Sequence, residues 1–181
     1  MICLIGESGS GKSTIEREIC RRFGLKKVVS YTTRPMRDGE VDGYDYHFVS
    51  EDKFKQMEDN GEFAETTVFR DWHYGATIKD VVASDVFVIE PIGLRKLLGR
   101  RNELGVTIIP IYICVPERSR MIRMLQRGDN IDEVMRRVGN DRETFKGVNE
   151  LVEHTVFNSF HSSFAVDEVM GIYRMGYRKD D

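Results

Sequence analysis

The stretch that decides how this chain folds reads Gly6-Glu7-Ser8-Gly9-Ser10-Gly11-Lys12-Ser13-Thr14. It fits the phosphate-binding P-loop pattern G-x-x-x-x-G-K-[ST]. Its glycines let the backbone curl, so that successive N–H groups form a concave anion site. Lys12 adds a positive charge for the outer phosphates of a ligand. The Ser13 hydroxyl suits a magnesium ion, which prefers hard oxygen ligands. The sequence therefore predicts a phosphate-binding loop with Ser13 as a metal ligand.

The residues on either side have the order that this loop requires. Residues 2–5 form a short apolar run, as expected of a buried parallel strand. Behind the loop, Ile15, Ile19 and Phe23 recur every four residues and form one apolar helical stripe. Gly24 is a typical helix end. This order of strand, loop and helix favours a true P-loop over a chance glycine-rich turn.

The composition excludes several classes of protein. The chain has 181 residues, 40% hydrophobic and 31% charged, with a net charge of -3. That length can bury one sizeable core, and no excess of positive charge indicates a nucleic-acid partner. Cys3, Cys20 and Cys114 lie within apolar runs and match no metal site, which indicates reduced core residues. No signal peptide or membrane span is visible, so we expect a cytoplasmic protein.

Short apolar strands alternate with amphipathic helices along most of the chain. We expect strands at 27–30, 86–89, 107–114 and 154–157, and helices at 93–103, 117–127, from 132 onward and at 163–173. Such alternation favours a parallel sheet covered on both faces by helices. The predicted fold class is therefore α/β: a three-layer α/β/α P-loop fold with a central parallel sheet.

The stretch from 31 to 77 has a different texture, rich in charge, glycine and aromatic residues. Turn signals at Asp38-Gly39 and Asp42-Gly43 precede expected strands at 44–49 and 62–69. Between these strands, Ser50 is expected to cap a helix at 51–59. We interpret 31–77 as an inserted, mostly antiparallel subdomain in a single domain of 1–181, whose core is 1–30 and 78–181.

Donors suited to an anion gather around this insertion. Ser30, Arg34 and Arg37 combine a hydroxyl with planar guanidinium forks that match a phosphate. Tyr46 adds a phenolic donor. A solvated basic loop is the alternative for the two arginines. His47 points the opposite way along its strand, so we interpret it as structural.

Glu65 indicates a different kind of recognition. An ionised carboxylate only accepts hydrogen bonds. It can therefore pair with adjacent N–H donors, such as the N1–H and 2-amino group of guanine. An exposed strand charge is the alternative. Further along, Tyr74 offers another phenol beside Gly75, which permits close approach of a ligand.

Four motifs now carry a family resemblance: GESGSGKST from Gly6, SYTTRPMRDGEVDGYDYHF from Ser30, GEFAE from Gly61 and YGAT from Tyr74. In this order and spacing they resemble guanylate kinase, specifically over residues 6 to about 77 and more loosely to about 158. The resemblance implies a nucleoside monophosphate kinase fold in which residues 6–14 bind ATP with Mg²⁺, the insertion binds GMP, and about 123–142 forms a short helical lid.

The resemblance also assigns roles to single residues. It implies that the GMP phosphate is held by Ser30, Arg34, Arg37, Tyr46 and Tyr74. It implies that Glu65 reads the guanine edge, as the chemistry of its carboxylate independently suggests. Asn158 resembles a residue near the adenine of ATP.

Three arginines of the later chain match the lid. Arg123 and Arg127 are four apart on one predicted helix and share a face, and Arg137 lies beyond the Gly128-Asp129-Asn130 break. With Lys12 and Arg37 they would stabilise charge on the transferred phosphoryl group.

Other residues of the lid receive structural assignments. We expect Arg118, Arg120 and Arg136 to be solvated. The apolar face of the helix at 117–127 is expected at Met121, Ile122 and Leu125, and Asp132 is expected to cap the next helix.

Two positions depart from the family pattern. The family usually has Asp-x-Asp at the end of the strand that follows the GMP-binding subdomain, which is the strand expected here at 86–89. Here Val88 stands at the first position, where it cannot hold a magnesium-bound water, and Glu90 at the second keeps an acid for the guanine. At a further GMP-binding position Ala76 replaces the usual Ser or Thr. Both changes bear on rate, metal affinity and base selectivity.

The predicted reaction is ATP-dependent phosphorylation of GMP, and of dGMP, by Mg²⁺-assisted in-line transfer. One alternative is a related P-loop kinase that acts on another phosphorylated acceptor, such as ribose 1,5-bisphosphate or a different nucleotide. The other is a non-catalytic guanylate-kinase-like module that binds proteins. The missing acid at Val88 favours the module, whereas the intact P-loop disfavours it.

Overall fold

The computed structural model of the protein describes residues 1–69, 71–159 and 162–177. Four parallel strands form its central sheet in the order β6-β1-β7-β8. They are β6 (Val86–Val88), β1 (Ile2–Ile5), β7 (Ile109–Cys114) and β8 (His154–Phe157). Ile2 is in register with Val86 on one side and Ile109 on the other, so the strand that enters the P-loop lies inside the sheet.

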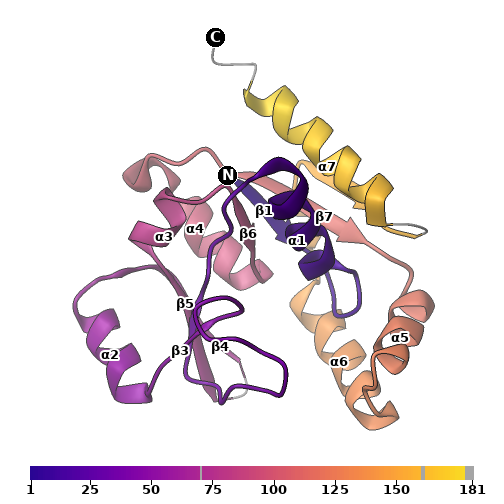
Figure 1. The fold of residues 1–181 in the computed structure, drawn as a ribbon, viewed down its shortest axis with the longest axis horizontal. Coiled ribbons are helices and arrows are strands. Elements are labelled where there is room, and N and C mark those ends of the chain that lie inside the picture. Colours follow the sequence, from indigo (N-terminus) through magenta and orange to yellow (C-terminus); the bar gives the residue numbers. More distant parts are fainter. Residues whose placement is uncertain (70, 160–161, 178–181) are drawn as a thin grey trace.

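Helices cover both faces of this sheet (Figure 1). Ile2 and Leu4 of β1 pack with α1 (Lys12–Phe23) and α7 (Ser162–Tyr177). Cys3 and Ile5, which alternate with them, pack on the other face with α3 (Ile78–Val82) and α4 (Pro91–Leu104). The predicted α/β/α class is confirmed, and its cause is this alternation of buried side chains along each strand.

The carboxyl ends of the parallel strands meet at one edge of the sheet. The P-loop follows β1, Glu90 follows β6, α5 (Glu117–Gln126) follows β7, and Asn158 follows β8. Ligands of open α/β sheets bind outside the carboxyl ends of the strands. This topology therefore brings residues far apart in sequence to one site.

A second four-stranded sheet, in the order β3-β2-β5-β4, lies within residues 31–77. Its strands are β2 (Tyr31–Thr32), β3 (His47–Phe48), β4 (Phe63–Phe69) and β5 (Trp72–Thr77). Two pairings are antiparallel and one, between β2 and β3, is parallel. Helix α2 (Glu51–Asp59) buries Phe54 and Met57 against this sheet, and Phe54 stacks on Phe63 with ring centroids 4.5 Å apart.

Helices α5 and α6 (Ile131–Thr144) form an antiparallel pair on the other side of the molecule (Figure 1). Their small core consists of Met124, Val134 and Val138, with Met121 packed against it. The 3₁₀ turn η1 (Val148–Glu150) then leads to β8. Within the described residues, no helix combines the length and the apolar character needed to cross a membrane.

Several expectations about local structure were wrong. The strand expected at 27–30 is a single bridge between Lys27 and Val86, because Lys27 and Ser30 interrupt a very short apolar run. The strand expected at 44–49 is shortened to His47–Phe48. Asn130, not Asp132, caps α6 by accepting the Glu133 N–H at 2.9 Å. Sequence patterns also missed β5, since Trp72–Thr77 does not alternate between apolar and polar residues.

Candidate active site

A cavity of about 320 Å³ opens between the second sheet, the end of β6 and α6. It brings together most residues predicted to bind the acceptor. Those that line it are Ser30, Arg37, Tyr46, Glu65, Tyr74 and Glu90, joined by Ser8 of the P-loop and Arg137 of α6. One cavity thus connects the phosphate-binding loop with the acidic and phenolic groups of the insertion.

Side chains behind the P-loop hold three successive backbone carbonyls. Arg120 donates to the Ser8 carbonyl at 3.2 Å, and Asn158 donates to the Ser10 carbonyl at 2.8 Å. Arg123 lies 3.5 Å from the Gly9 and Ser10 carbonyls. In a trans peptide the next N–H points away from the carbonyl. The N–H groups of Gly9 and Gly11 therefore face away from these donors, on the side that we assign to phosphates.

Two glycines allow this tight packing. Gly9 has φ 79° and Gly11 has φ 93°, which L side chains rarely adopt. A Cβ atom on Gly9 would meet the Arg120 carbonyl oxygen at 2.7 Å. A Cβ atom on Gly11 would meet Asn158 Nδ2 at 2.5 Å. The loop can thus approach both neighbours only without side chains at these positions.

Lys12 begins α1 and folds back over the loop. Its ammonium group donates to the Gly6 carbonyl and, at 3.3 Å, to the Glu7 carbonyl. A bound polyphosphate can replace these carbonyls with stronger, charged acceptors. The position of Lys12 therefore suits a cation that moves from the loop to the ligand.

A β-bulge presents Glu65 to the cavity. The register between β4 and β5 shifts between Phe63 and Glu65, and bulges commonly redirect a side chain beside an active site. Glu65 is 7% exposed, and its Oε2 atom has no hydrogen-bond partner. Burial raises the pKa of Glu65 to about 7, although Lys96 and the Ala76 N–H oppose the rise. A buried acceptor without a donor is costly, so this site is built to receive one.

Gly93, in the first turn of α4, makes room for that carboxylate. A Cβ atom there would lie 2.6 Å from Glu65 Oε2. Glu90 lines the same cavity, where its side chain is exposed. The protein atoms around its carboxylate nevertheless displace water and so raise the pKa of Glu90, whereas the positive charge of Lys12 opposes this rise.

Two predicted acceptor residues do not line the cavity. Arg34 is buried and forms a bidentate pair with Glu40, at 2.8 and 3.0 Å. Its guanidinium lies 5.4 Å from the ring centroid of Tyr46, so it supports the cavity wall from behind. Ala76 has a fully buried side chain that packs in the core. Ala76 therefore lies behind the cavity wall and not on it.

The two phenols lie next to each other. Tyr46 and Tyr74 meet edge to face with ring centroids 6.0 Å apart. Burial raises the pKa of Tyr46 to about 12. The Tyr46 hydroxyl therefore stays protonated near neutral pH and can donate a hydrogen bond to an anion.

The predicted lid arginines have separate partners. Arg123 donates to the Asn158 carbonyl at 2.6 Å, and Arg127 donates to Asp129 at 3.0 Å. Arg137 lines the cavity and donates to Glu133 at 2.8 Å. The structure therefore brings Arg137 to the cavity, while Arg123 contacts the back of the P-loop and Arg127 lies in the turn between α5 and α6.

Two predictions about α5 were wrong. Arg120 is buried with 4% exposure, whereas Ile122 and Leu125 are 45% and 43% exposed. The buried face runs through Arg120 and Met124, which are four residues apart. The spacing of four between Arg120 and Met124 could have indicated the buried face, but a charged residue is not normally assigned to one. Arg118 is exposed as expected, and Arg136 is half-buried at the cavity.

Ser13 is the protein ligand available for the expected magnesium ion. The described residues contain no group of three or more His, Cys, Asp and Glu side chains that could hold a metal. Val88 lines the cavity without an oxygen to offer, and Ser13 is exposed in the first turn of α1. Mg²⁺ typically keeps several waters and binds through one or two protein oxygens plus substrate phosphates. Ser13 fits a site of that kind.

Comparison with known proteins identifies the family of this chain. The guanylate kinase family model matches residues 1–159. The chain belongs to the guanylate kinase family. It is 34% identical over 156 residues to guanylate kinase of Sulfurimonas denitrificans, covering 83% of this chain and 76% of that protein. It is 35% identical over 161 residues to guanylate kinase of Rhodopseudomonas palustris, covering 84% and 73%.

The fold agrees with a solved guanylate kinase. The crystal structure of guanylate kinase from Anaplasma phagocytophilum superposes with a TM-score of 0.71 at 23% identity, over 97% of this chain and 85% of that chain. At this identity the likeness concerns the fold alone. It shows that a solved guanylate kinase has the same overall fold as this chain.

Replacing Gly9 tests the packing of the loop. We expect Gly9→Ala to weaken binding of ADP at least 100-fold, because the added methyl group meets the Arg120 carbonyl and the backbone has positive φ. Isothermal titration calorimetry measures this. The control is Gly99→Ala in α4, where nothing lies within 4 Å of the new methyl group. Equal ADP affinity in both variants would contradict the proposed loop geometry.

Proposed function

We propose that this chain catalyses transfer of the γ-phosphoryl group of ATP to GMP, and also to dGMP, in the cavity described above. Family membership gives the reaction class. The single observation that carries the acceptor is Glu65: a buried carboxylate oxygen without a partner, in the same cavity as Ser8 of the P-loop. Guanine presents two adjacent N–H donors that would satisfy it.

The acceptor phosphate would lie at the opposite end of the cavity from Glu65. Arg37, Tyr46 and Tyr74 line that cavity and offer N–H and O–H donors. Ser30 adds a hydroxyl, and Arg34 keeps the Tyr46 wall in place through its pairing with Glu40. These groups bind an anion without supplying a base.

No protein base is required for the reaction. The second pKa of a phosphate monoester is about 6, so GMP is mostly a dianion near neutral pH and its oxygen is already nucleophilic. The protein has to align two polyanions and neutralise charge as the phosphoryl group moves. The candidates for this role are Lys12 of the P-loop, and Arg37 and Arg137, which line the cavity.

The donor side would hold ATP with Mg²⁺. The proposed Mg²⁺ neutralises phosphate charge when bound, and Ser13 would be its protein ligand. Lys12 would leave the Gly6 and Glu7 carbonyls for the outer phosphates. In the proposed closed state, the lid at about 123–142 closes over a GMP-binding subdomain at 31–77 and excludes water, while Asp141 stays on the P-loop. Arg127 then approaches the phosphates, and Arg123 exchanges the loop carbonyls for them.

The three cysteines support a proposal about the compartment. Cys3 is buried, and Cys20 and Cys114 are half-buried and unpaired. Reduced cysteines of this kind are typical of a reducing compartment. We therefore place this activity in the cytoplasm.

The decisive experiment is a nucleotide panel. A coupled assay of ADP production, run with GMP, dGMP, AMP and UMP, should show GMP and dGMP preferred over the other two. Lys12→Ala should lower kcat/KM at least 100-fold, the usual effect of removing a charge aimed at the transition state. Equal rates with all four acceptors would contradict the proposal, and ATP binding without turnover would favour a non-catalytic module.

Glu65 predicts a specific pH dependence. Only the ionised carboxylate accepts the guanine N–H groups, and its pKa of about 7 means that the ionised fraction falls as pH falls. We therefore expect the Kd of GMP to rise roughly tenfold from pH 8 to pH 6, since about a tenth of the carboxylate stays ionised one unit below its pKa.

The Glu65→Gln variant separates this effect from titration of the GMP phosphate. It should bind GMP more weakly at pH 8 and keep only the smaller pH dependence that comes from the phosphate itself. Calorimetric titration at both pH values measures the difference. An unchanged pH profile in the variant would show that Glu65 does not read the base.

A further inference from the structure

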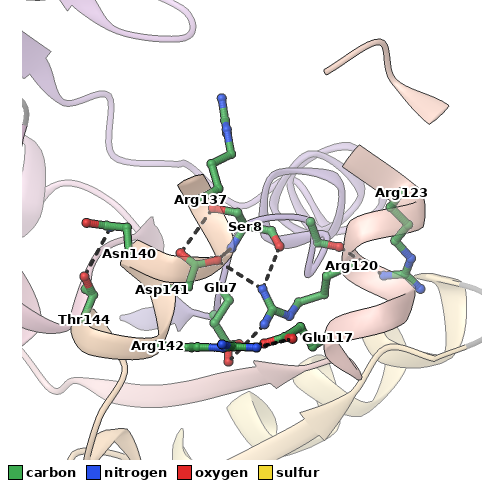
Figure 2. Close-up of polar contacts among 12 residues, drawn as sticks. Glu7, Ser8, Glu117, Arg120, Arg123, Arg137, Asn140, Asp141, Arg142 and Thr144 are labelled. Atoms are coloured by element: carbon green, nitrogen blue, oxygen red, sulfur yellow. Dashed lines mark hydrogen bonds and ion pairs between the residues drawn. The ribbon is translucent and has the colours of Figure 1, made fainter. Parts of the chain in front are cut away.

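A buried ion cluster joins the P-loop to helices α5 and α6 (Figure 2). Arg120 of α5 lies at its centre with 4% exposure. Its Nη1 atom donates to the Ser8 carbonyl at 3.2 Å and to Asp141 Oδ2 at 3.1 Å. Its Nη2 atom lies 3.8 Å from Glu7 Oε1. Arg120 therefore contacts two consecutive P-loop residues and one residue of α6.

Asp141 makes a second, separate connection to the loop. Its Oδ2 atom accepts the Ser8 backbone N–H at 2.9 Å, and its Oδ1 atom accepts the Ser8 hydroxyl at 3.2 Å. Both groups of Ser8 thus point at one carboxylate of α6, as Figure 2 shows. Asp141 fixes the orientation of the Ser8 peptide, which lies next to the phosphate-binding glycines.

Arg120 has two carboxylate partners, so replacing one of them still leaves the guanidinium with a counter-charge. Arg120 lies between Glu7 and Asp141, and Glu7 is also held by the Tyr112 hydroxyl at 2.7 Å. A buried guanidinium without any counter-charge would be strongly destabilising. With Asp141 removed, Glu7 still faces Arg120. Asp141 is therefore not needed merely to neutralise Arg120, and its contacts with Ser8 indicate a further role.

A neighbouring ion pair lacks the connection to the loop. Arg142 of α6 donates to Glu117 of α5 at 2.7 and 3.1 Å. It joins the same two helices as the Arg120–Asp141 pair, but it is more exposed, and its hydrogen bonds go to Glu117 and not to the P-loop. The two pairs thus separate helix–helix contact from contact with the loop.

We propose that Arg120 and Asp141 are positioning residues for the ATP site, which hold the Glu7–Ser8 turn of the P-loop in its phosphate-binding shape and couple that shape to the docking of α6. The inference rests on the proposed function for the identity of the ligand. Without this pair, the backbone around Ser8 can rotate, and the affinity of the P-loop for ATP or ADP falls. Tyr46, Glu65 and Tyr74 lie in the inserted region, outside this cluster, and should keep their geometry, whereas Asp141 and Arg137 of α6 also line the acceptor cavity.

The test compares Asp141→Ala, Asp141→Asn and Arg142→Ala. Calorimetric titration with Mg-ADP and, separately, with GMP gives the affinity of each site without requiring turnover. Asp141→Ala should weaken ADP binding at least tenfold and GMP binding by a clearly smaller factor, because Asp141 is only one of many residues that line the acceptor cavity. Asp141→Asn should lose about threefold, because its amide oxygen can still accept the Ser8 N–H. Arg142→Ala should bind both ligands as the unchanged protein does.

The outcomes separate this inference from the proposed function. Unchanged ADP affinity in Asp141→Ala, equal losses for ADP and GMP, or the same loss in Arg142→Ala would each overturn the positioning role. If Asp141→Ala does not fold, as shown by circular dichroism, the Asn variant decides by the same comparison. If the unchanged protein binds ADP but not GMP, GMP is not the acceptor and the proposed function is wrong. The ADP affinities of the variants would still test the role of Asp141.

Discussion

The structure depends on keeping three backbone carbonyls away from the phosphate site. A loop can bind a polyanion only if its N–H groups point inward, and each inward N–H requires the preceding carbonyl to point outward. Such carbonyls need partners of their own because they are partly buried. Here the carbonyls of Ser8, Gly9 and Ser10 face Arg120, Arg123 and Asn158.

This constraint accounts for the arrangement of the later chain. Arg120 and Arg123 come from α5, and Asn158 comes from the end of β8, so both elements must return to the carboxyl edge of the sheet. Parallel topology places them there. The same edge receives Glu90 from β6 and faces the second sheet, whose bulge turns Glu65 into the shared cavity. The phosphate-binding loop of the central sheet and Glu65 of the second sheet thus reach the same cavity.

Much of this arrangement could be predicted from sequence because the signals are local. The P-loop pattern, the alternating strands and the helix at 51–59 each depend on neighbouring residues, and the structure contains all three. Contacts that join distant elements could not be predicted in this way. Arg120 looked like a surface residue because its partners, Glu7 and Asp141, lie 113 and 21 positions away. The bulge at Glu65 and the burial of Ala76 likewise depend on the packing of β4 against β5 and the core.

The measurement that tests this account most directly is a crystal structure of the protein with ADP, Mg²⁺ and GMP bound. We predict that Glu65 accepts hydrogen bonds from the guanine N1–H and 2-amino groups. We also predict that the Ser8 and Ser10 carbonyls keep their contacts with Arg120 and Asn158 while the loop N–H groups bind the ADP phosphates. A guanine bound away from Glu65, or a loop carbonyl turned toward a phosphate, would contradict the account.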